Sequence, residues 1–185
     1  GTGATIFRHG VMGASDQEIP MPSERELIAL NIAVLTVSDS RTQAQDTSGA
    51  LLISRLSDAG HSLAERRIVK DDIYAIRAQV SAWIADPEVN VVLSTGGTGV
   101  TGRDGTPEAV APLLDKQIDG FGEVFRMLSY QGIKTSTIQS RALAGVANAT
   151  YIFCLPGSSG ACRDAWDQII SAQLDYRTRP CNLVE

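Results

Sequence analysis

The chain contains few cysteines and histidines, and this scarcity excludes several classes of site. Three of its 185 residues are cysteine and two are histidine. The cysteines are odd in number and form no Cys-x-x-Cys pair, which argues against a disulfide framework or a zinc knuckle and favours a reducing cytoplasm. Two histidines leave little material for a histidine-rich metal site or a Ser-His-Asp triad, and Gly157–Gly160 does not match Gly-x-Ser-x-Gly.

Long apolar runs and an excess of positive charge are also absent. No apolar run approaches the roughly 18 residues of a membrane-spanning helix. The formal net charge of -5 argues against general binding to nucleic acid or to acidic membranes. Hydrophobic residues make up 43% of the chain and charged residues 20%, a composition typical of one globular domain with its own core. An anionic ligand would therefore have to be held by local groups.

The pattern along the chain divides it at about residue 30. Residues 1–30 lack periodicity and are rich in Gly, Pro and polar side chains, so we interpret them as a flexible leader, in part an expression-vector remnant, without a signal-peptide core. In residues 31–185, apolar runs alternate with amphipathic stretches, which predicts a single α/β domain. The expected strands are 31–37, 62–69, 89–95 and 150–156. The expected helices include residues 47–59, 73–84 and 120–130. A further helix is expected to have Thr106 as N-cap and Pro107 as first residue, and another should follow Gly160.

The stretch "STGGTGVTGRDGTPEAV", residues 94–110, resembles two phosphate-binding motifs and satisfies neither. A P-loop needs Lys and then Ser or Thr after its last glycine, where this chain has Arg103 and Asp104. A dinucleotide-binding turn needs a helix that begins at once, and Pro107 delays it. Four glycines within residues 96–102 exceed the needs of one turn, although glycines that only build a tight turn remain the alternative. We interpret the loop as a phosphate-binding loop with a carboxylate at its edge.

Three polar loops follow expected strands. They are Ser38-Asp39-Ser40, residues 95–104, and residues 156–159. In open α/β sheets, ligands bind outside the carboxyl ends of the strands, so we expect these loops to form one crevice. The turn Gly157-Ser158-Ser159-Gly160 offers backbone N–H groups and two hydroxyls to an anion.

Several charged residues near these loops have two interpretations each. A carboxylate beside bound phosphates needs an intervening cation, which points to Mg²⁺ at Asp104. Of the adjacent acids Asp71 and Asp72, one can cap the following helix, and the other, which we take to be Asp71, is free for function. Arg41 and Arg103 are either solvated surface residues or partners of phosphates. Glu123 either faces solvent or accepts hydrogen bonds from a heterocycle, and Cys154 is interpreted as a core residue.

Seven ordered motifs together resemble the molybdopterin-binding family of molybdenum cofactor biosynthesis, from about residue 31 to the end. The motifs are "LTVSDSR", "DTSG", "DAGH", "STGGTGVTGRDGTPEA", "GFGEVFRMLS", "SRALAGVAN" and "LPGSSGACRDAW". The resemblance implies a three-layer α/β sandwich with a mostly parallel sheet flanked by helices. It also implies assembly into trimers or hexamers, and molybdopterin binding at the glycine loop.

For function, the resemblance implies Mg²⁺-dependent adenylylation, in which the terminal phosphate of molybdopterin attacks the α-phosphorus of ATP and pyrophosphate leaves. The catalytic, metal-binding aspartates of the family match Asp71 and Asp104, and a downstream molybdenum-insertion protein is an expected partner. The expected substrate-binding residues are Ser38, Asp39, Thr95, Gly96, Gly97, Thr98, Gly99, Arg103, Glu123, Pro156, Gly157, Ser158 and Ser159. Because some members lack the aspartate pair, a non-catalytic oligomeric carrier of the pterin stays open as an alternative. A third, weaker alternative is an unrelated nucleotide-binding module whose glycine loop holds another phosphate.

Overall fold

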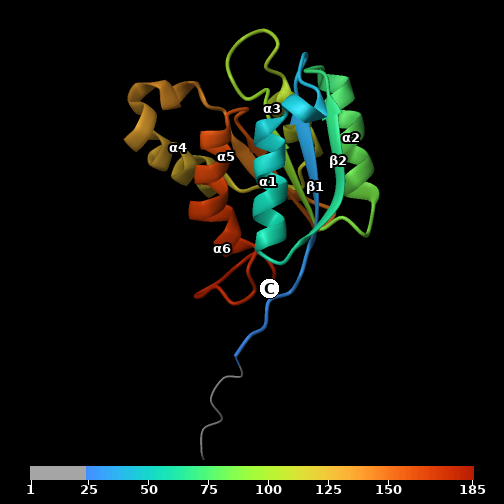
Figure 1. The fold of residues 1–185 in the computed structure, drawn as a ribbon, viewed down its shortest axis with the longest axis vertical. Coiled ribbons are helices and arrows are strands. Elements are labelled where there is room, and N and C mark those ends of the chain that lie inside the picture. The colour runs from blue at the N-terminus through green and yellow to red at the C-terminus, as the bar shows by residue number, and fades with distance from the viewer. Residues whose placement is uncertain (1–23) are drawn as a thin grey trace, which may run out of the picture.

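The computed structural model describes residues 24–185, which form a sheet covered by helices on both faces (Figure 1). Six strands make up the sheet in the order β2-β1-β3-β6-β5-β4. The strands are β1 (Asn31–Val37), β2 (Ser62–Val69), β3 (Val91–Thr95), β4 (Lys116–Gln117), β5 (Leu143–Ala147) and β6 (Thr150–Leu155). Strands β2, β1, β3 and β6 are parallel, whereas β5 is antiparallel to both β6 and β4. The predicted mostly parallel three-layer fold is therefore confirmed.

The helices lie between the strands in the order expected for an α/β domain. They are α1 (Thr47–Asp58), α2 (Ile73–Ala85), α3 (Thr106–Val110), α4 (Asp119–Ile133), α5 (Ser159–Ala165) and α6 (Ser171–Gln173), and a π-helical segment, Trp166–Ile170, joins the last two. Shorter 3-10 turns are η1 (Gln43–Gln45), η2 (Ala111–Leu113) and η3 (Lys134–Gln139). Within residues 24–185, no helix is both long and apolar enough to cross a membrane.

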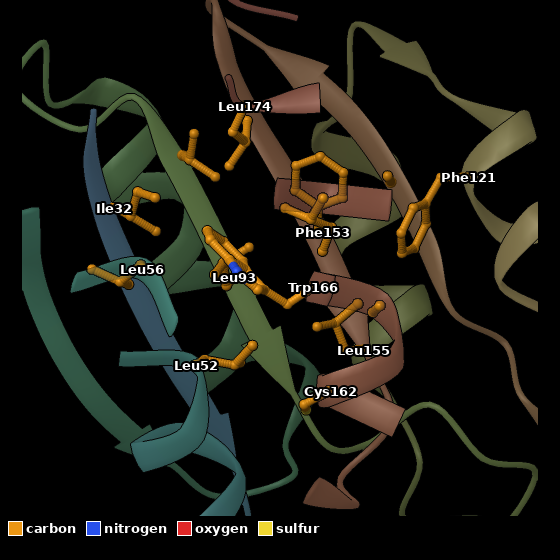
Figure 2. Packing of buried hydrophobic residues seen from close by; sticks show 14 of the residues in the cluster. Ile32, Leu52, Leu56, Leu93, Phe121, Phe153, Leu155, Cys162, Trp166 and Leu174 are labelled. Atoms are coloured by element: carbon orange, nitrogen blue, oxygen red, sulfur yellow. The ribbon is translucent and has the colours of Figure 1, made fainter. Parts of the chain in front are cut away.

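Two hydrophobic cores lie on opposite faces of the sheet, because successive strand residues point to opposite sides. Helices α1, α4 and α5 pack on one face, where Figure 2 shows Leu52 and Leu56 of α1 against Ile32 and Leu93. Helices α2 and α3 cover the other face with side chains such as Trp83. Strand β3 is buried along its whole length, as its continuous apolar sequence predicts.

The sequence did not reveal two antiparallel strands: β4, at the edge of the sheet, and β5, which lies between β4 and β6. Strand β4 has only two residues, too few to show a periodicity. Strand β5 joins β6 through Asn148 and Ala149, both with positive φ angles of 48° and 62°. A two-residue hairpin turn requires this left-handed conformation, but Ala is not a residue that signals it.

Residues 1–23 of the expected leader lie outside the described residues. Residues 24–30 form no helix or strand, yet they contact the domain. The Leu30 N–H donates a hydrogen bond to Nδ1 of His61 at 3.0 Å, and the Arg25 guanidinium lies 4.6 Å from the centre of the Tyr176 ring. The division of the chain at residue 30 stays a prediction.

A buried acid fixes the start of α1. Asp46 is the N-cap and accepts a hydrogen bond from the Gly49 N–H at 3.0 Å. Its second carboxylate oxygen accepts from the Thr36 hydroxyl at 2.6 Å and pairs with Arg66 at 3.1 Å. Burial acts to raise the pKa of Asp46, but these hydrogen bonds and the arginine outweigh it, so the pKa lies below the ordinary aspartate value.

Candidate functional site

The polar loops after β1, β3 and β6 surround one cavity of about 510 Å³, which confirms the expected crevice. Strands β1, β3 and β6 are neighbours and parallel, so their carboxyl ends lie at the same edge of the sheet. The cavity is lined by Val37, Ser38, Ser40, Arg41, Asp71, Gly96, Gly97, Thr98, Gly99, Asp104, Gln139, Ser140, Pro156 and Gly157.

The glycine loop packs its backbone directly against neighbouring atoms. Gly96 and Gly97 have φ angles of +104° and +72°. A Cβ atom on Gly96 would lie 2.2 Å from the Val37 carbonyl oxygen, and one on Gly97 would lie 2.3 Å from Oγ1 of Thr106. These two glycines are therefore needed for the tight turn itself. Among the described residues, the N–H groups of Gly97 and Thr98 donate no hydrogen bond, so both are free for an anion at the cavity.

Thr106 is not the N-cap of the helix after this loop, contrary to the sequence-based prediction. Helix α3 begins at Thr106 itself, with Gly105 as N-cap. The Thr106 hydroxyl instead donates to the Gly96 carbonyl oxygen at 2.9 Å, and its N–H donates to the Gly97 carbonyl oxygen at 3.0 Å. Both bonds tie the helix to the glycine loop, which a sequence pattern cannot show.

Asp104 closes the second half of the glycine loop. Its Oδ2 atom accepts hydrogen bonds from the Thr101 N–H at 2.9 Å and from the Thr101 hydroxyl at 2.8 Å. A Cβ atom on Gly99 would lie 2.7 Å from the same oxygen. Burial acts to raise the pKa of Asp104, but the hydrogen bonds from Thr101 and Gly99 and the charge of Arg141 outweigh it, so the pKa lies below the ordinary value. Asp104 is thus an ionised turn residue that also lines the cavity.

The adjacent acids Asp71 and Asp72 have separate roles, as the sequence predicts. Asp72 caps α2 and accepts hydrogen bonds from the N–H groups of its first turn. Asp71 instead accepts from the Gly105 N–H at 3.1 Å and lines the cavity. Burial raises the pKa of Asp71 above the ordinary value, and the charge of Asp104 acts in the same direction.

Asp71 and Asp104 both lie against the glycine loop, Asp71 at Gly97 and Asp104 at Gly99. A Cβ atom on Gly97 would lie 3.0 Å from Oδ2 of Asp71, just as Gly99 contacts Asp104. The two acids come from different segments of the chain, and each is fixed by a backbone N–H of residues 99–105. Both carboxylates line the same cavity, and carboxylate oxygens are the ligand type that Mg²⁺ prefers.

Arg103 and Asp39, both expected substrate-binding residues, pair with each other instead of lining the cavity. The guanidinium of Arg103 makes two hydrogen bonds to the Asp39 carboxylate, at 2.7 and 3.0 Å. Arg103 lines a second hollow of about 380 Å³, which shares Asp71 and Asp104 with the main cavity. Asp39 also accepts a hydrogen bond from the Asp71 N–H at 3.1 Å, so it supports the loop that carries Asp71.

Four further expected residues lie outside the cavity wall. Thr95 is fully buried, and its hydroxyl donates to the Pro156 carbonyl oxygen at 2.9 Å, beneath the crevice. Ser158 is the N-cap of α5, and the Ser159 hydroxyl donates to Oγ1 of Thr47 at 3.1 Å. Glu123 lines a separate hollow of about 310 Å³ at the start of α4. For Thr95, Ser158 and Ser159, a position at or just after the end of a strand is thus not sufficient to place the side chain in the crevice.

The segment before β5 contributes residues that the sequence did not assign to the site. Gln139 and Ser140 line the cavity, and the next residue, Arg141, holds the glycine loop. The Arg141 guanidinium donates to the carbonyl oxygens of Gly99 at 2.7 Å and Asp104 at 2.9 Å, and it forms an ion pair with Glu108. The motif "SRALAGVAN" contains this arginine, but only the fold brings it to residues 99–104.

The two buried cysteines take no part in the chemistry of the crevice. Cys154 and Cys162 are fully buried. Burial raises the pKa of Cys154 to about 12 and that of Cys162 to about 11, so neither forms a thiolate near neutral pH. The interpretation of Cys154 as a core residue is confirmed.

Comparison with known proteins identifies the family. The family model described as "Probable molybdopterin binding domain" matches residues 33–176. The chain belongs to this molybdopterin-binding domain family. It is 60% identical to molybdenum cofactor biosynthesis protein B of Escherichia coli K12 over 157 residues, which cover 85% of this chain and 92% of that protein. Its identity to the Bacillus subtilis protein of the same name is 48%, over 79% of this chain and 86% of the relative.

Solved structures of family members share the fold. A crystal structure of molybdenum cofactor biosynthesis protein B superposes with a TM-score of 0.79 at 45% identity, covering 81% of this chain and 94% of that chain. The tungsten cofactor synthesizing protein MoaB from Pyrococcus furiosus superposes with a TM-score of 0.66 at 35% identity, covering 77% of this chain and 91% of that chain. Membership in the molybdopterin-binding domain family excludes the hypothesis of an unrelated nucleotide-binding module.

Proposed function

We propose that this protein acts in molybdenum cofactor biosynthesis, where it binds molybdopterin at the crevice and adenylylates it with Mg-ATP. An oxygen of the terminal phosphate of the pterin forms a bond to the α-phosphorus of ATP. The bond between that phosphorus and the bridging oxygen to the β-phosphate breaks, and pyrophosphate leaves with the electron pair. The observation that carries this proposal is that Asp71 and Asp104 line the same cavity as the free N–H groups of the glycine loop.

The side chains at the crevice suit Mg²⁺. Asp71 and Asp104 provide carboxylate oxygens, the ligand type that Mg²⁺ prefers. Within residues 24–185, no group of three or more His, Cys, Asp or Glu side chains could hold a metal by itself. Phosphate oxygens and water would complete the coordination, as is usual for Mg²⁺ sites that act on nucleotides. The bound cation would neutralise charge that develops on the transferring phosphate.

The contribution of the chain itself is positioning. Two polyanions must meet at the crevice, and the reaction needs no strong base because a phosphate oxygen is already a nucleophile. The N–H groups of Gly97 and Thr98 would orient one phosphate, while Thr101 and Gly105 hold the two carboxylates in place. Fixed groups of this kind stabilise developing charge without reorganising during the reaction.

A non-catalytic carrier of the pterin is the second candidate, and one observation favours it. The Oδ2 atom of Asp104 is already engaged by Thr101, so the loop keeps its shape without any metal. A carrier would need the glycine loop but neither carboxylate as a metal ligand. It would bind molybdopterin and leave ATP unchanged.

The experiment that separates the two candidates uses neighbouring acids as a matched pair. We incubate the protein with molybdopterin and Mg-ATP and measure adenylylated pterin by mass spectrometry. Asp71→Asn should abolish most product, whereas Asp72→Asn should retain it, because Asn also caps helices and Asp72 only caps α2. Equal product formation in the two variants would contradict a catalytic role for Asp71. If the wild-type protein forms no product, the non-catalytic carrier is the function that remains.

We also propose a cytoplasmic homo-oligomer, a trimer or hexamer, that passes its product to a molybdenum-insertion protein. An exposed apolar stripe on α4 supports the assembly: Val124, Met127, Tyr130 and Ile133 are 41–59% exposed and three residues apart. Light scattering should give a multiple of the 19.7 kDa chain mass. Met127→Asp should lower that mass, and a monomer at all working concentrations would contradict the assembly.

A further inference from the structure

The crevice needs a cation for its anionic ligand, and the sequence offers two arginines for that role. Asp71 and Asp104 already place negative charge at the cavity, and the whole chain carries a net charge of -5. The structure separates the two arginines. Arg103 is committed to Asp39 through two hydrogen bonds and does not line the main cavity, whereas Arg41 does line it.

Arg41 is held at the cavity without using most of its donors. The Ser38 hydroxyl oxygen accepts a hydrogen bond from the Arg41 N–H at 3.0 Å, which fixes the turn after β1. The Nη1 atom donates to Oγ of Ser48 at 3.3 Å and to the Gly157 carbonyl oxygen at 3.2 Å. Within residues 24–185, Nε and Nη2 donate no hydrogen bond and no carboxylate forms an ion pair with Arg41.

The position of Arg41 places its guanidinium where the three loops meet. Its partner Gly157 lies against the glycine loop, because a Cβ atom on Gly157 would be 3.4 Å from Cα of Gly96. The next loop residues, Gly97 and Thr98, carry the free N–H groups. A guanidinium with free donors that lines the same cavity as free backbone N–H groups suits the three terminal oxygens of a phosphate monoester.

We infer that Arg41 binds the terminal phosphate of the pterin, and that the Arg103–Asp39 pair is structural. The identification of this phosphate as that of the pterin rests on the proposed function. The existence of a phosphate-binding site at Arg41 does not. Arg41 would neutralise the phosphate from the β1 side of the crevice, whereas the carboxylates of Asp71 and Asp104 would hold the proposed cation.

The test measures inorganic phosphate binding at pH 8 and constant ionic strength, followed through the amide NMR signals of Gly97 and Thr98. Arg41→Gln should weaken phosphate binding at least about tenfold, because a charge-assisted hydrogen-bonding partner is lost. The phosphate affinity of Arg41→Lys should lie between those of the wild type and Arg41→Gln, since lysine retains the positive charge but not the planar pair of guanidinium donors. Arg55→Gln removes the same charge from an exposed ion pair with Asp167 and should bind like the wild type. Thermal unfolding verifies that each variant is folded.

Each outcome decides the inference. Wild-type affinity in Arg41→Gln, an equal loss in Arg55→Gln, or a larger loss in Arg103→Gln would overturn it. Molybdopterin binding should weaken in parallel with phosphate binding, and pterin affinity that is independent of Arg41 would overturn the assignment of the phosphate to the pterin. Arg41-dependent phosphate binding without adenylyl transfer would support the site and refute the proposed reaction.

Discussion

Replacing Gly97 by Ala tests whether the glycine loop has the geometry described. Gly97 has a φ of +72°, and an added Cβ would lie 2.3 Å from Oγ1 of Thr106, 3.0 Å from Oδ2 of Asp71 and 3.2 Å from Cγ1 of Val37. The left-handed backbone costs roughly 1–2 kcal/mol for a residue with a Cβ. Overpacking costs typically about 1–3 kcal/mol more. The free energy of unfolding should therefore fall by about 2–5 kcal/mol.

The matched control lies in the same loop. A Cβ on Gly102 would meet nothing within 4 Å, and its φ is not positive, so Gly102→Ala should change stability by less than about 0.5 kcal/mol. Urea unfolding at one protein concentration measures both variants. Because the new methyl group also pushes against Asp71, Gly97→Ala should lose product formation in the folded fraction. Equal unfolding midpoints for Gly97→Ala and Gly102→Ala would refute the loop geometry.

Three further outcomes follow from other parts of the molecule. Arg141→Lys should speed amide hydrogen exchange in residues 97–105 at least about tenfold, because the bonds to two loop carbonyls are lost, whereas Arg77→Lys, which loses similar bonds to α3, should not affect that segment. The lowered pKa of Asp46 gives stability that is present above its unfolded pKa of about 3.9 and lost as pH falls through the folded value, so acid should destabilise the wild type more steeply than Asp46→Asn in urea titrations. A thiol reagent should label one cysteine per native chain, the exposed Cys181, and three after unfolding. Faster exchange of residues 97–105 in both arginine variants would contradict the first prediction. Acid titrations of equal steepness for the wild type and Asp46→Asn would contradict the second, and labelling of more than one cysteine in the native chain would contradict the third.

The fold was predictable because its signals are local. Apolar runs such as 31–37 and 91–95 are long and buried on both faces, and Gly60, with a φ of +92°, ends α1 as expected. The division of labour between Asp71 and Asp72 was also predictable, because only one of two adjacent acids can cap α2. Edge strand β4 escaped prediction because two residues show no periodicity.

The site was less predictable because side-chain direction depends on packing between distant segments. Thr95 is expected in the loop after β3, yet it is the last residue of that strand and is fully buried below the crevice. Ser158 and Ser159 are expected to bind the anion through their hydroxyls, but in the structure Ser158 caps α5 and Ser159 donates a hydrogen bond to Thr47. The sequence analysis placed Arg103 among the substrate-binding residues and left Arg41 out, but in the structure Arg103 pairs with Asp39 and Arg41 lines the main cavity.

The most direct test of the central claim is pyrophosphate release from ATP in the presence of molybdopterin, measured for the wild type and Asp104→Asn with and without Mg²⁺. Asn keeps the shape of Asp104 but removes the charge proposed to hold the cation, so the wild type should release pyrophosphate only with Mg²⁺. Asp104→Asn should be slower by orders of magnitude. Pterin binding should survive in Asp104→Asn, because the loop N–H groups and Arg41 remain. Equal rates in the two proteins, or no release by the wild type with Mg²⁺, would contradict the account.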